Sequence, residues 1–406
     1  MGLDGARPSE VHMTVSTILG VLAFLSLGLV LWQFVVAMRF PLHRRIPNPA
    51  FAPDITILKP LKGCDAETRE CLESWMTQSY CGKAQILFGV HSADDPVCGV
   101  GRELIAAHSE VDARLVVCPK QPGPNAKVST LIHLQAEAKY EVIAVSDADV
   151  HVPSDFLAQA VAPLENPKVG LVNCFYRLPS RPRWRLLFDP DAQAMRMEEF
   201  AVNCDFWSQV LQARSLKPLD FSLGAVMITT QARLRQIGAF QSLVDYLADD
   251  YQLGNQIAKA GGEIVVNPIV VDCRSAPMTM RDVWDHQLRW ARTIRVSQPV
   301  PYFFSILNDS TFWVSLYVIF AGTSSPSQFA LFGYIALRLL GSMKLERDLT
   351  GKWDVTTLYF AIFHDMVRPL IWAWSFFGNT VVWRGQKYRV LRGGKLVADR
   401  ANTGFN

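Results

Sequence analysis

Two carboxylates that follow a short apolar run are the first candidates for chemistry in this sequence. The run Val142–Ser146 is rich in β-branched residues and leads directly into Asp147-Ala-Asp149. In an extended backbone, residues i and i+2 point to the same side, so we expect Asp147 and Asp149 to share a face. Carboxylates crowded at the end of a buried strand favour a hard cation such as Mg²⁺ or Mn²⁺, whose shell substrate phosphates usually complete. The pattern therefore predicts a metal and diphosphate site, with a solvated turn as the alternative.

The chain around this pair alternates between predicted strands and predicted helices. Strands are expected at 55–58, 85–90, 114–118, 142–146, 169–173 and 223–228, and helices at 66–78, 97–108, after Lys127 and at 191–213. Such alternation implies right-handed crossovers and a mostly parallel sheet, with ligands at the carboxyl ends of its strands. Lys59, His91 and Asp147 follow three of these strands. We therefore expect an α/β catalytic domain over residues 54–277 with its site at that edge.

A second pair of acids opens a later predicted helix. The segment Tyr246-Leu-Ala-Asp-Asp-Tyr251 begins a helix that runs to Lys259 and stops at the glycines that follow. Asp249 and Asp250 lie in its first turn, where the helix dipole favours carboxylates. Helix capping needs only one acid, so Asp250 remains a candidate general base.

Apolar stretches at both ends predict an integral membrane protein. Half of the 406 residues are apolar, and 15–38 contains no charged residue. That stretch is long enough to cross a bilayer, and the basic residues after it favour a retained anchor at 14–38 with the following chain in the cytoplasm. Further membrane segments are predicted within 311–383: one interrupted span at 312–343, with a tight hairpin as the alternative, and another at 355–383.

Charged regions lie before and after these C-terminal segments. Residues 278–305 are amphipathic, and Arg289, Arg292 and Arg295 form a basic strip that suits either a diphosphate or the headgroup layer of a membrane. Residues 384–406 form a basic tail that suits anionic lipid headgroups. No basic-aromatic pattern indicates nucleic acid as a partner.

Three ionisable residues lie inside the last apolar stretch. His364, Asp365 and Arg368 are spaced so that they can pair with one another on a helix. Ionisable groups at membrane depth are costly, so a structural pair, a place at the interface and a contact with substrate all remain open.

Taken in order, these signals resemble the ceramide glucosyltransferase family of membrane-bound, inverting nucleotide-sugar transferases. The resemblance covers about residues 55–297, together with the anchor before them and the tail from Trp383 to Arg389. Bacterial relatives linked to hopanoid synthesis, which transfer N-acetylglucosamine, are similar to this chain as well. The motifs that carry the resemblance are Lys59-Pro-Leu-Lys-Gly63, Asp94-Asp95-Pro96, Asp147-Ala-Asp149, Ala248-Asp-Asp-Tyr251 and Arg289-Trp290.

The resemblance implies a GT-A, Rossmann-like fold that uses a UDP-sugar and a divalent cation, Mg²⁺ or Mn²⁺. It implies that Asp147 and Asp149 handle the metal and the diphosphate and that Asp250 is the catalytic base. His286 departs from the family, whose members carry Gln or Arg three residues before the Arg-Trp pair. The residues expected to bind the donor are Asp95, at the nucleobase or ribose, and Lys127, Asp147, His286, Arg289, Trp290 and Arg292.

We therefore expect a UDP-sugar-dependent enzyme that glycosylates a lipid hydroxyl at the cytoplasmic face of a bacterial inner membrane or an equivalent bilayer. Ceramide glucosyltransferase-like activity is the first expectation, and hopanoid-linked N-acetylglucosaminyl transfer is the alternative. A processive polysaccharide synthase is less favoured, because three predicted spans are too few for a polymer channel. A non-catalytic membrane scaffold does not account for acids at the expected strand ends.

Overall fold

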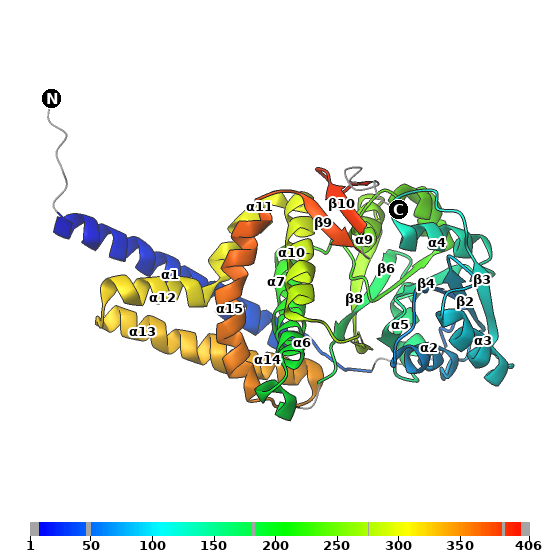
Figure 1. Cartoon of the computed structure of the whole chain (residues 1–406), viewed down its shortest axis with the longest axis horizontal. Helices are drawn as coiled ribbons and strands as arrows, with labels where there is room; N and C mark the ends of the chain where they lie inside the picture. The colour runs from blue at the N-terminus through cyan, green and yellow to red at the C-terminus, as the bar shows by residue number, and fades with distance from the viewer. Residues whose placement is uncertain (1–7, 46–49, 181–182, 275, 384–385, 399–406) are drawn as a thin grey trace. The chain divides into compact units, whose positions relative to one another are not determined.

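The chain folds into two compact units. The computed structural model describes residues 8–45, 50–180, 183–274, 276–383 and 386–398 (Figure 1). What we call the sheet unit comprises Pro41–Arg181, Ala213–Met278 and Thr380–Asn406, and the helical unit comprises Met1–Phe40, Pro182–Gln212 and Thr279–Asn379. The predicted catalytic domain at 54–277 is therefore interrupted, because residues 182–212 belong to the helical unit.

A large sheet forms the core of the sheet unit. Its strands, in spatial order, are β3 (Asp112–Val117), β2 (Ala84–Val90), β1 (Ile55–Pro60), β4 (Val142–Ser146), β7 (Val226–Thr230), β6 (Val169–Arg177), β8 (Glu263–Cys273) and β5 (Val150–His151). Strands β1 to β4 run parallel and β6 runs parallel to β8, whereas β7 is antiparallel to both of its neighbours. The expected mostly parallel sheet is confirmed, and the carboxyl ends of β1, β2 and β4 lie along one edge.

Helices cover this sheet and hold the loops at its edge. They are α2 (Thr68–Met76), α3 (Val97–Ala107), α4 (Ala126–Ala136), α5 (Phe156–Val161), α8 (Gln231–Gln236) and α9 (Asp249–Lys259), with short turns η1 (Ala162–Glu165) and η4 (Phe240–Leu243). Helix α4 lies against β1 and β2. A Cβ at Gly89 of β2 would be 2.5 Å from Thr130 Cγ2 and 2.8 Å from Leu134 Cδ1, so this close approach of α4 depends on glycine.

The end of the chain adds a small antiparallel sheet to the sheet unit. Its strands are β9 (Thr380–Trp383), β10 (Gln386–Val390) and β11 (Leu396–Ala398), in the order β11-β10-β9. Residues 380–383, predicted as the end of a membrane segment, form a strand instead, and the strands at 386–390 and 396–398 lie within the predicted basic tail. Arg384 and Arg400 of that predicted tail lie outside the described residues.

The helical unit consists of one long helix and many shorter ones. One helix among the described residues, His12–Arg39, is by length and composition alone long and apolar enough to cross a membrane, which fits the predicted anchor. Its helices and turns are α1 (Pro8–Arg39), η2 (Arg183–Leu187), α6 (Pro190–Phe200), η3 (Ala201–Phe206), α7 (Trp207–Leu216), α10 (Met280–Ser297), α11 (Pro299–Phe304), η5 (Ser305–Asn308), α12 (Ser310–Ala321), α13 (Ser325–Tyr334), η6 (Ile335–Leu340), α14 (Gly341–Thr350) and α15 (Thr356–Ser375).

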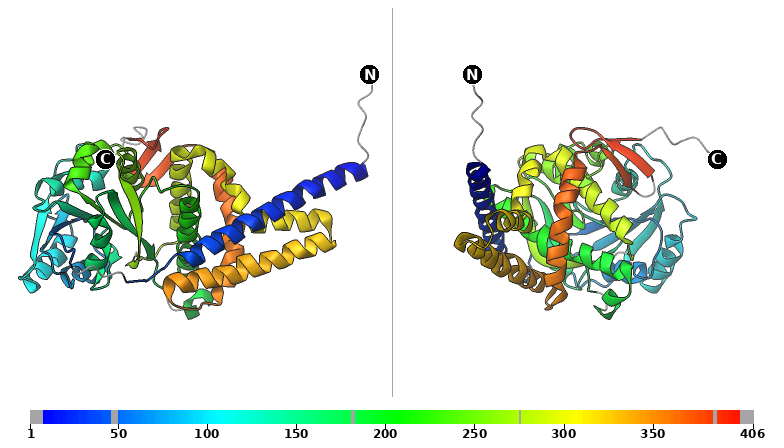
Figure 2. Two further views of the ribbon diagram at one scale, coloured as in Figure 1. Left: turned by 180° about the vertical axis from the view of Figure 1, so that it is seen from behind. Right: turned by 60° about the vertical axis from the view of Figure 1, so that its left-hand side comes forward.

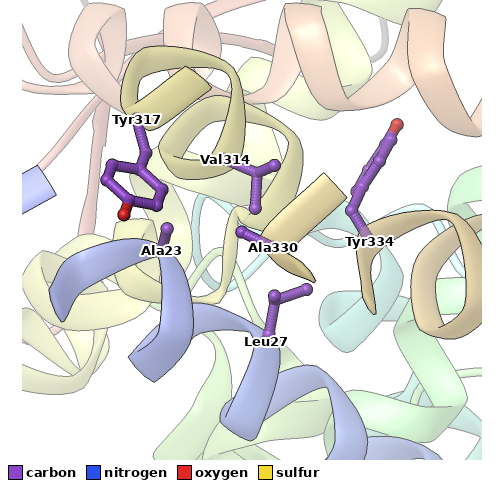
Figure 3. Close-up of a cluster of buried hydrophobic side chains, with 6 residues drawn as sticks. All are labelled: Ala23, Leu27, Val314, Tyr317, Ala330 and Tyr334. Carbon is purple, nitrogen blue, oxygen red and sulfur yellow. The ribbon is translucent and has the colours of Figure 1, made fainter. Parts of the chain in front are cut away.

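Helices α12 and α13 form a hairpin beside α1. Figure 2 shows the two helices side by side, and both contact α1. The chain reverses at Gly322, whose φ of +61° is a conformation that side chains other than glycine rarely adopt. Figure 3 shows the shared core, which consists of Ala23 and Leu27 from α1, Val314 and Tyr317 from α12, and Ala330 and Tyr334 from α13.

The hairpin corrects the prediction for the C-terminal membrane segments. The preferred interpretation of 312–343 as one interrupted span is replaced by its alternative, a tight hairpin. A second segment is long and apolar enough to cross a membrane only if the helices Pro299–Asn308 and Ser310–Ala321, which are bent by 51° relative to each other, are counted as one. Within the described part of the chain, no helix after residue 321 is long and apolar enough to cross a membrane by itself.

The close approach of α4 to β2 leads to a stability prediction. Gly89→Ala should lower the free energy of unfolding by about 1–3 kcal/mol, because the added methyl group overpacks the space held by Thr130 and Leu134. Urea unfolding of the full chain in detergent measures the effect. Gly99→Ala is the matched control, since a Cβ there meets no atom within 4 Å and the helix interior of α3 favours alanine. Equal loss of stability in both variants would contradict the packing argument.

Candidate functional site

The Asp147–Asp149 segment lies where β4 ends. The strand stops at Ser146, and the next residues form a turn in which Val150 N donates to Asp147 O over 3.4 Å. The expectation that strand alternation puts both carboxylates on one face is therefore wrong, because the backbone is no longer extended there. The two groups still interact, since burial and then the Asp147 carboxylate raise the pKa of Asp149 to about 6.

Lys127 joins this turn to the first turn of α9. Its buried Nζ lies 2.7 Å from Asp147 Oδ1 and 3.2 Å from Asp249 Oδ2. Burial alone would lower the pKa of Lys127, but the two carboxylates outweigh it and raise the pKa above its ordinary value. The Asn125 side chain caps α4 by accepting from Val128 N and so fixes where Lys127 lies in the helix. Three segments distant in the sequence therefore meet at one buried ammonium group.

Asp250 lies next to this ion-paired group. Its Oδ1 accepts from Tyr251 N over 2.7 Å, and Ser222 Oγ donates to its backbone carbonyl over 2.7 Å. Burial and the neighbouring Asp249 carboxylate raise the pKa of Asp250 to about 6. A Cβ at Gly224 would lie 2.8 Å from Asp250 Oδ2, so glycine keeps the space beside this oxygen free of side chain. A carboxyl group with a pKa near neutrality is suited to general base chemistry.

Lys59 is a second buried ammonium group at this edge, where the sequence placed it without assigning it a role. Its Nζ donates to Asp147 O over 2.7 Å and to Ser146 Oγ over 3.2 Å, and it lies 4.7 Å from the centroid of the Trp75 ring. Burial lowers the pKa of Lys59 to about 8. The sequence signal was a lysine within a strand that is otherwise apolar except for Thr56, Ile-Thr-Ile-Leu-Lys-Pro.

Asp95 organises a different pair of loops in the same unit. Its Oδ1 accepts from Gly63 N over 3.0 Å and from Val97 N over 3.1 Å, so it joins the loop after β1 to the start of α3. Gly63 has a φ of +70°, which explains the glycine at the end of the Lys-Pro-Leu-Lys-Gly motif. The assignment of Asp95 to the nucleobase or ribose stays a prediction.

His286 and Trp290 lie on α10, in the helical unit. A capping box of Thr279 and Asp282 begins this helix. His286 Nδ1 lies 2.7 Å from Oε1 of the buried Glu198, whose other oxygen accepts from Gln287 Nε2 over 2.7 Å. The rings of His286 and Trp290 are 4.7 Å apart. Their role at the donor, and that of Arg289, stays a prediction.

Arginines of the predicted basic strip contact the end of α15. Arg292 donates to Phe377 O over 3.0 Å, and Arg295 donates to Gly378 O over 3.2 Å. These carbonyl groups lie just beyond α15, which ends at Ser375, so the two arginines hold the segment that leaves the helix. This contact gives Arg292 a structural role beside its predicted role at the diphosphate.

The ionisable residues of α15 join a buried network within the helical unit. Arg338 donates to both oxygens of Asp205, over 2.7 and 2.9 Å, and to Asp365 Oδ2 over 2.7 Å. Arg368 pairs with Asp309 over 3.0 Å. Asp205, His364 and Asp365 bring ligand atoms within 4.8 Å of one another, but Arg338 already pairs with both carboxylates, and Arg368 lies 3.5 Å from Asp205. The geometry supports the structural alternative for these residues over a metal site.

The sheet edge, in contrast, has a donor set that fits a hard divalent cation. Carboxylates at 147, 149, 249 and 250 and ammonium groups at 59 and 127 leave two excess negative charges when all are ionised. One divalent cation neutralises that excess, and carboxylate oxygens are the ligands that Mg²⁺ and Mn²⁺ prefer. The assignment of such a cation to Asp147 and Asp149 stays a prediction.

Comparison with known sequences supports the resemblance. The sequence profile described as "Glycosyl transferase family 21" matches residues 17–396. Ceramide glucosyltransferase 1 of Caenorhabditis elegans is 21% identical over 366 residues, which cover 88% of this chain and 76% of the relative. Ceramide glucosyltransferase of Komagataella phaffii is 32% identical over 157 residues, which cover 35% of this chain and 31% of the relative.

Comparison with solved structures supports the fold. The mannosyltransferase PcManGT from Pyrobaculum calidifontis, solved in complex with GDP-Man and Mn²⁺, superposes with a TM-score of 0.52. The match has 19% sequence identity and covers 88% of this chain and 99% of that chain. At this identity the likeness shows the fold alone, and it confirms the expected GT-A-like α/β fold.

The contacts of Lys127 lead to a second stability prediction. Lys127→Met should lower the free energy of unfolding by about 3–5 kcal/mol, because it leaves Asp147 and Asp249 without their buried cation. Urea unfolding at neutral pH measures the loss. Lys120→Met, at an exposed position before the same helix, is the control and should change stability little. Native stability in Lys127→Met would show that the ion pairs are not formed.

Proposed function

Because the chain belongs to glycosyl transferase family 21, we propose that it transfers a sugar from a UDP-sugar to the hydroxyl group of a lipid, with inversion at the anomeric carbon. The observation that carries this proposal is the meeting of Lys127, Asp147 and Asp249 beside Asp250 at the carboxyl edge of the sheet. Ceramide is the proposed acceptor and glucose the proposed sugar, as the names of the relatives suggest. Helix α1 is the proposed membrane anchor.

Asp250 is the proposed general base. Its carboxylate takes the proton of the acceptor hydroxyl as that oxygen forms a bond to the anomeric carbon. The bond from this carbon to the diphosphate breaks at the same time, and UDP leaves with the electron pair. Attack from the face opposite the leaving group inverts the anomeric centre. The space that Gly224 leaves beside Asp250 Oδ2 supports access of a hydroxyl group to this oxygen.

The remaining charges of the sheet edge are proposed to bind the donor. Lys127 holds Asp147 at the edge and Lys59 fixes the backbone of the same turn, so both lysines orient the carboxylates that face the diphosphate. A divalent cation on Asp147 and Asp149 would supply positive charge to the leaving diphosphate. Asp95, His286, Arg289, Trp290 and Arg292 remain the predicted residues for the rest of the donor.

The base assignment is tested by Asp250→Asn. This change should lower kcat by about 100-fold or more while donor binding stays near native, because only the proton acceptor is lost. Turnover is measured by mass spectrometry of glycosylated lipid made from UDP-glucose and ceramide. Asp245→Asn, an exposed acid close to α9, is the matched control and should retain native turnover. Native turnover in Asp250→Asn would refute the assignment.

The same assignment fixes the pH dependence. A base must be deprotonated to act, so turnover should fall as the pH drops through about 6, where Asp250 protonates. Asp249→Asn removes a neighbouring negative charge and should move this limb to lower pH. If the acidic limb of the pH–rate profile did not move in Asp249→Asn but disappeared in a variant of another residue, that residue would be the general base.

The metal assignment is tested by calorimetry with UDP. Mn²⁺ should strengthen UDP binding to the native chain, and Asp149→Asn should reduce that gain by at least about 10-fold, because one ligand of the cation is lost. Asp95→Asn is the comparison, since it should weaken UDP binding equally with and without Mn²⁺. Equal UDP affinity with and without Mn²⁺ in the native chain would overturn the assignment.

A further inference from the structure

The turn between β10 and β11 contacts the segment that leads into α9. Leu247 N donates to Gly394 O over 3.1 Å, and Leu396 N donates to Asp245 O over 2.7 Å. Gln252, in the first turn of α9, donates from Nε2 to Gly393 O over 3.1 Å. Segments about 150 residues apart in the sequence are therefore joined on both sides of Asp249 and Asp250.

Tyr246 is contacted by the β10–β11 hairpin and by Asn125, the N-cap of the helix that carries Lys127. It forms a β-bridge with Lys395, whose Nζ lies 5.8 Å from the centroid of the tyrosine ring. Its carbonyl group accepts from Asn125 Nδ2 over 2.8 Å, and Asn125 N donates to Val244 O over 3.0 Å. The segment before α9 is thus held between the hairpin and the cap of α4.

The β10–β11 hairpin is a regular antiparallel pair of strands with one buried face. Tyr388, Val390 and Leu396 are buried, although charged residues alternate with them along the strands. The turn has φ values of +83° at Gly393 and +91° at Gly394, which favour glycine at both positions. Because both carbonyl groups that accept from 247 and 252 belong to these glycines, the backbone of the turn sets the contact.

We propose that the β10–β11 turn is a positioning element of the transfer site, which fixes the first turn of α9 and hence the place of Asp250 relative to Lys127. The proposal rests on the function proposed above, because it assigns the turn a role in that same reaction. No atom of the turn takes part in the chemistry. Its contribution is to hold the base where the acceptor hydroxyl reacts, and small displacements of a reacting group are costly to turnover.

The test is Gly393→Val in the full-length enzyme. A β-branched residue at positive φ strains the turn, and a Cβ at Gly393 meets no atom within 4 Å, so strain is the change made. We expect kcat to fall about tenfold or more while the KM for UDP-glucose changes little. Hydrogen exchange of the amides from 245 to 252 should become faster, because Leu247 N loses its acceptor.

Two further variants separate positioning from general stability. Gly393→Asn should restore turnover and slow exchange, because asparagine tolerates the left-handed region better than valine. Gly261→Val is the matched control: its φ is +87°, a Cβ there also meets nothing within 4 Å, and it lies just beyond the opposite end of α9. It should lower the melting temperature without the tenfold loss of kcat. If Gly393→Val does not accumulate folded, Gly393→Ala applies a milder strain at the same place.

Turnover and hydrogen exchange of these variants together decide the proposal. Loss of kcat with faster exchange at 245–252, rescued by Gly393→Asn and absent in Gly261→Val, supports the proposal. Any of three results overturns it: native kcat per folded molecule in Gly393→Val, unchanged hydrogen exchange at 245–252 in that variant, or an equal loss of kcat in Gly261→Val. A native chain that transfers no sugar refutes the proposed function instead, and the exchange measurement still decides whether the turn holds α9.

Discussion

Repulsion among crowded carboxylates is the constraint on which the sheet edge depends. Asp147, Asp149, Asp249 and Asp250 come from two distant segments, and each pair raises the cost of ionising its members. Two buried lysines offset part of that cost but leave an excess of negative charge. An edge balanced in this way favours a divalent cation, because only added positive charge allows all four acids to ionise together.

The same constraint explains why the neighbouring backbone is so tightly fixed. An ammonium group between two carboxylates is stabilising only while it stays close to both of them. If the groups move apart where water is largely excluded, their charges are left unpaired. Asn125 fixes the start of α4, and Gly89 lets that helix lie close to β2. Lys127 depends on both, so its place is set by the capping and the packing of α4.

The sequence predicted the strands that lead to the site and the helix that carries Asp250, but it did not predict the β10–β11 hairpin that contacts the start of this helix. Apolar β-branched runs bounded by prolines and glycines indicated β1, β2 and β4 correctly, because such runs form buried parallel strands. The turn at Asp147–Asp149 was taken for extended backbone, since spacing alone does not show where extension stops. Lys59 was placed at this edge but was given no role, because burial of a lysine depends on partners that only the fold brings together.

The end of the chain shows why charge counts alone mislead. Basic residues from 387 to 395 predicted a tail for lipid headgroups, yet buried Tyr388, Val390 and Leu396 alternate among them with the period of a strand. Alternation on one face decides whether a basic segment stays solvated or joins a sheet, because the apolar face must be covered. In this chain, the hairpin that buries this face also brings the carbonyl groups of its turn to the segment that begins α9, where they accept hydrogen bonds. A count of charges does not predict that contact.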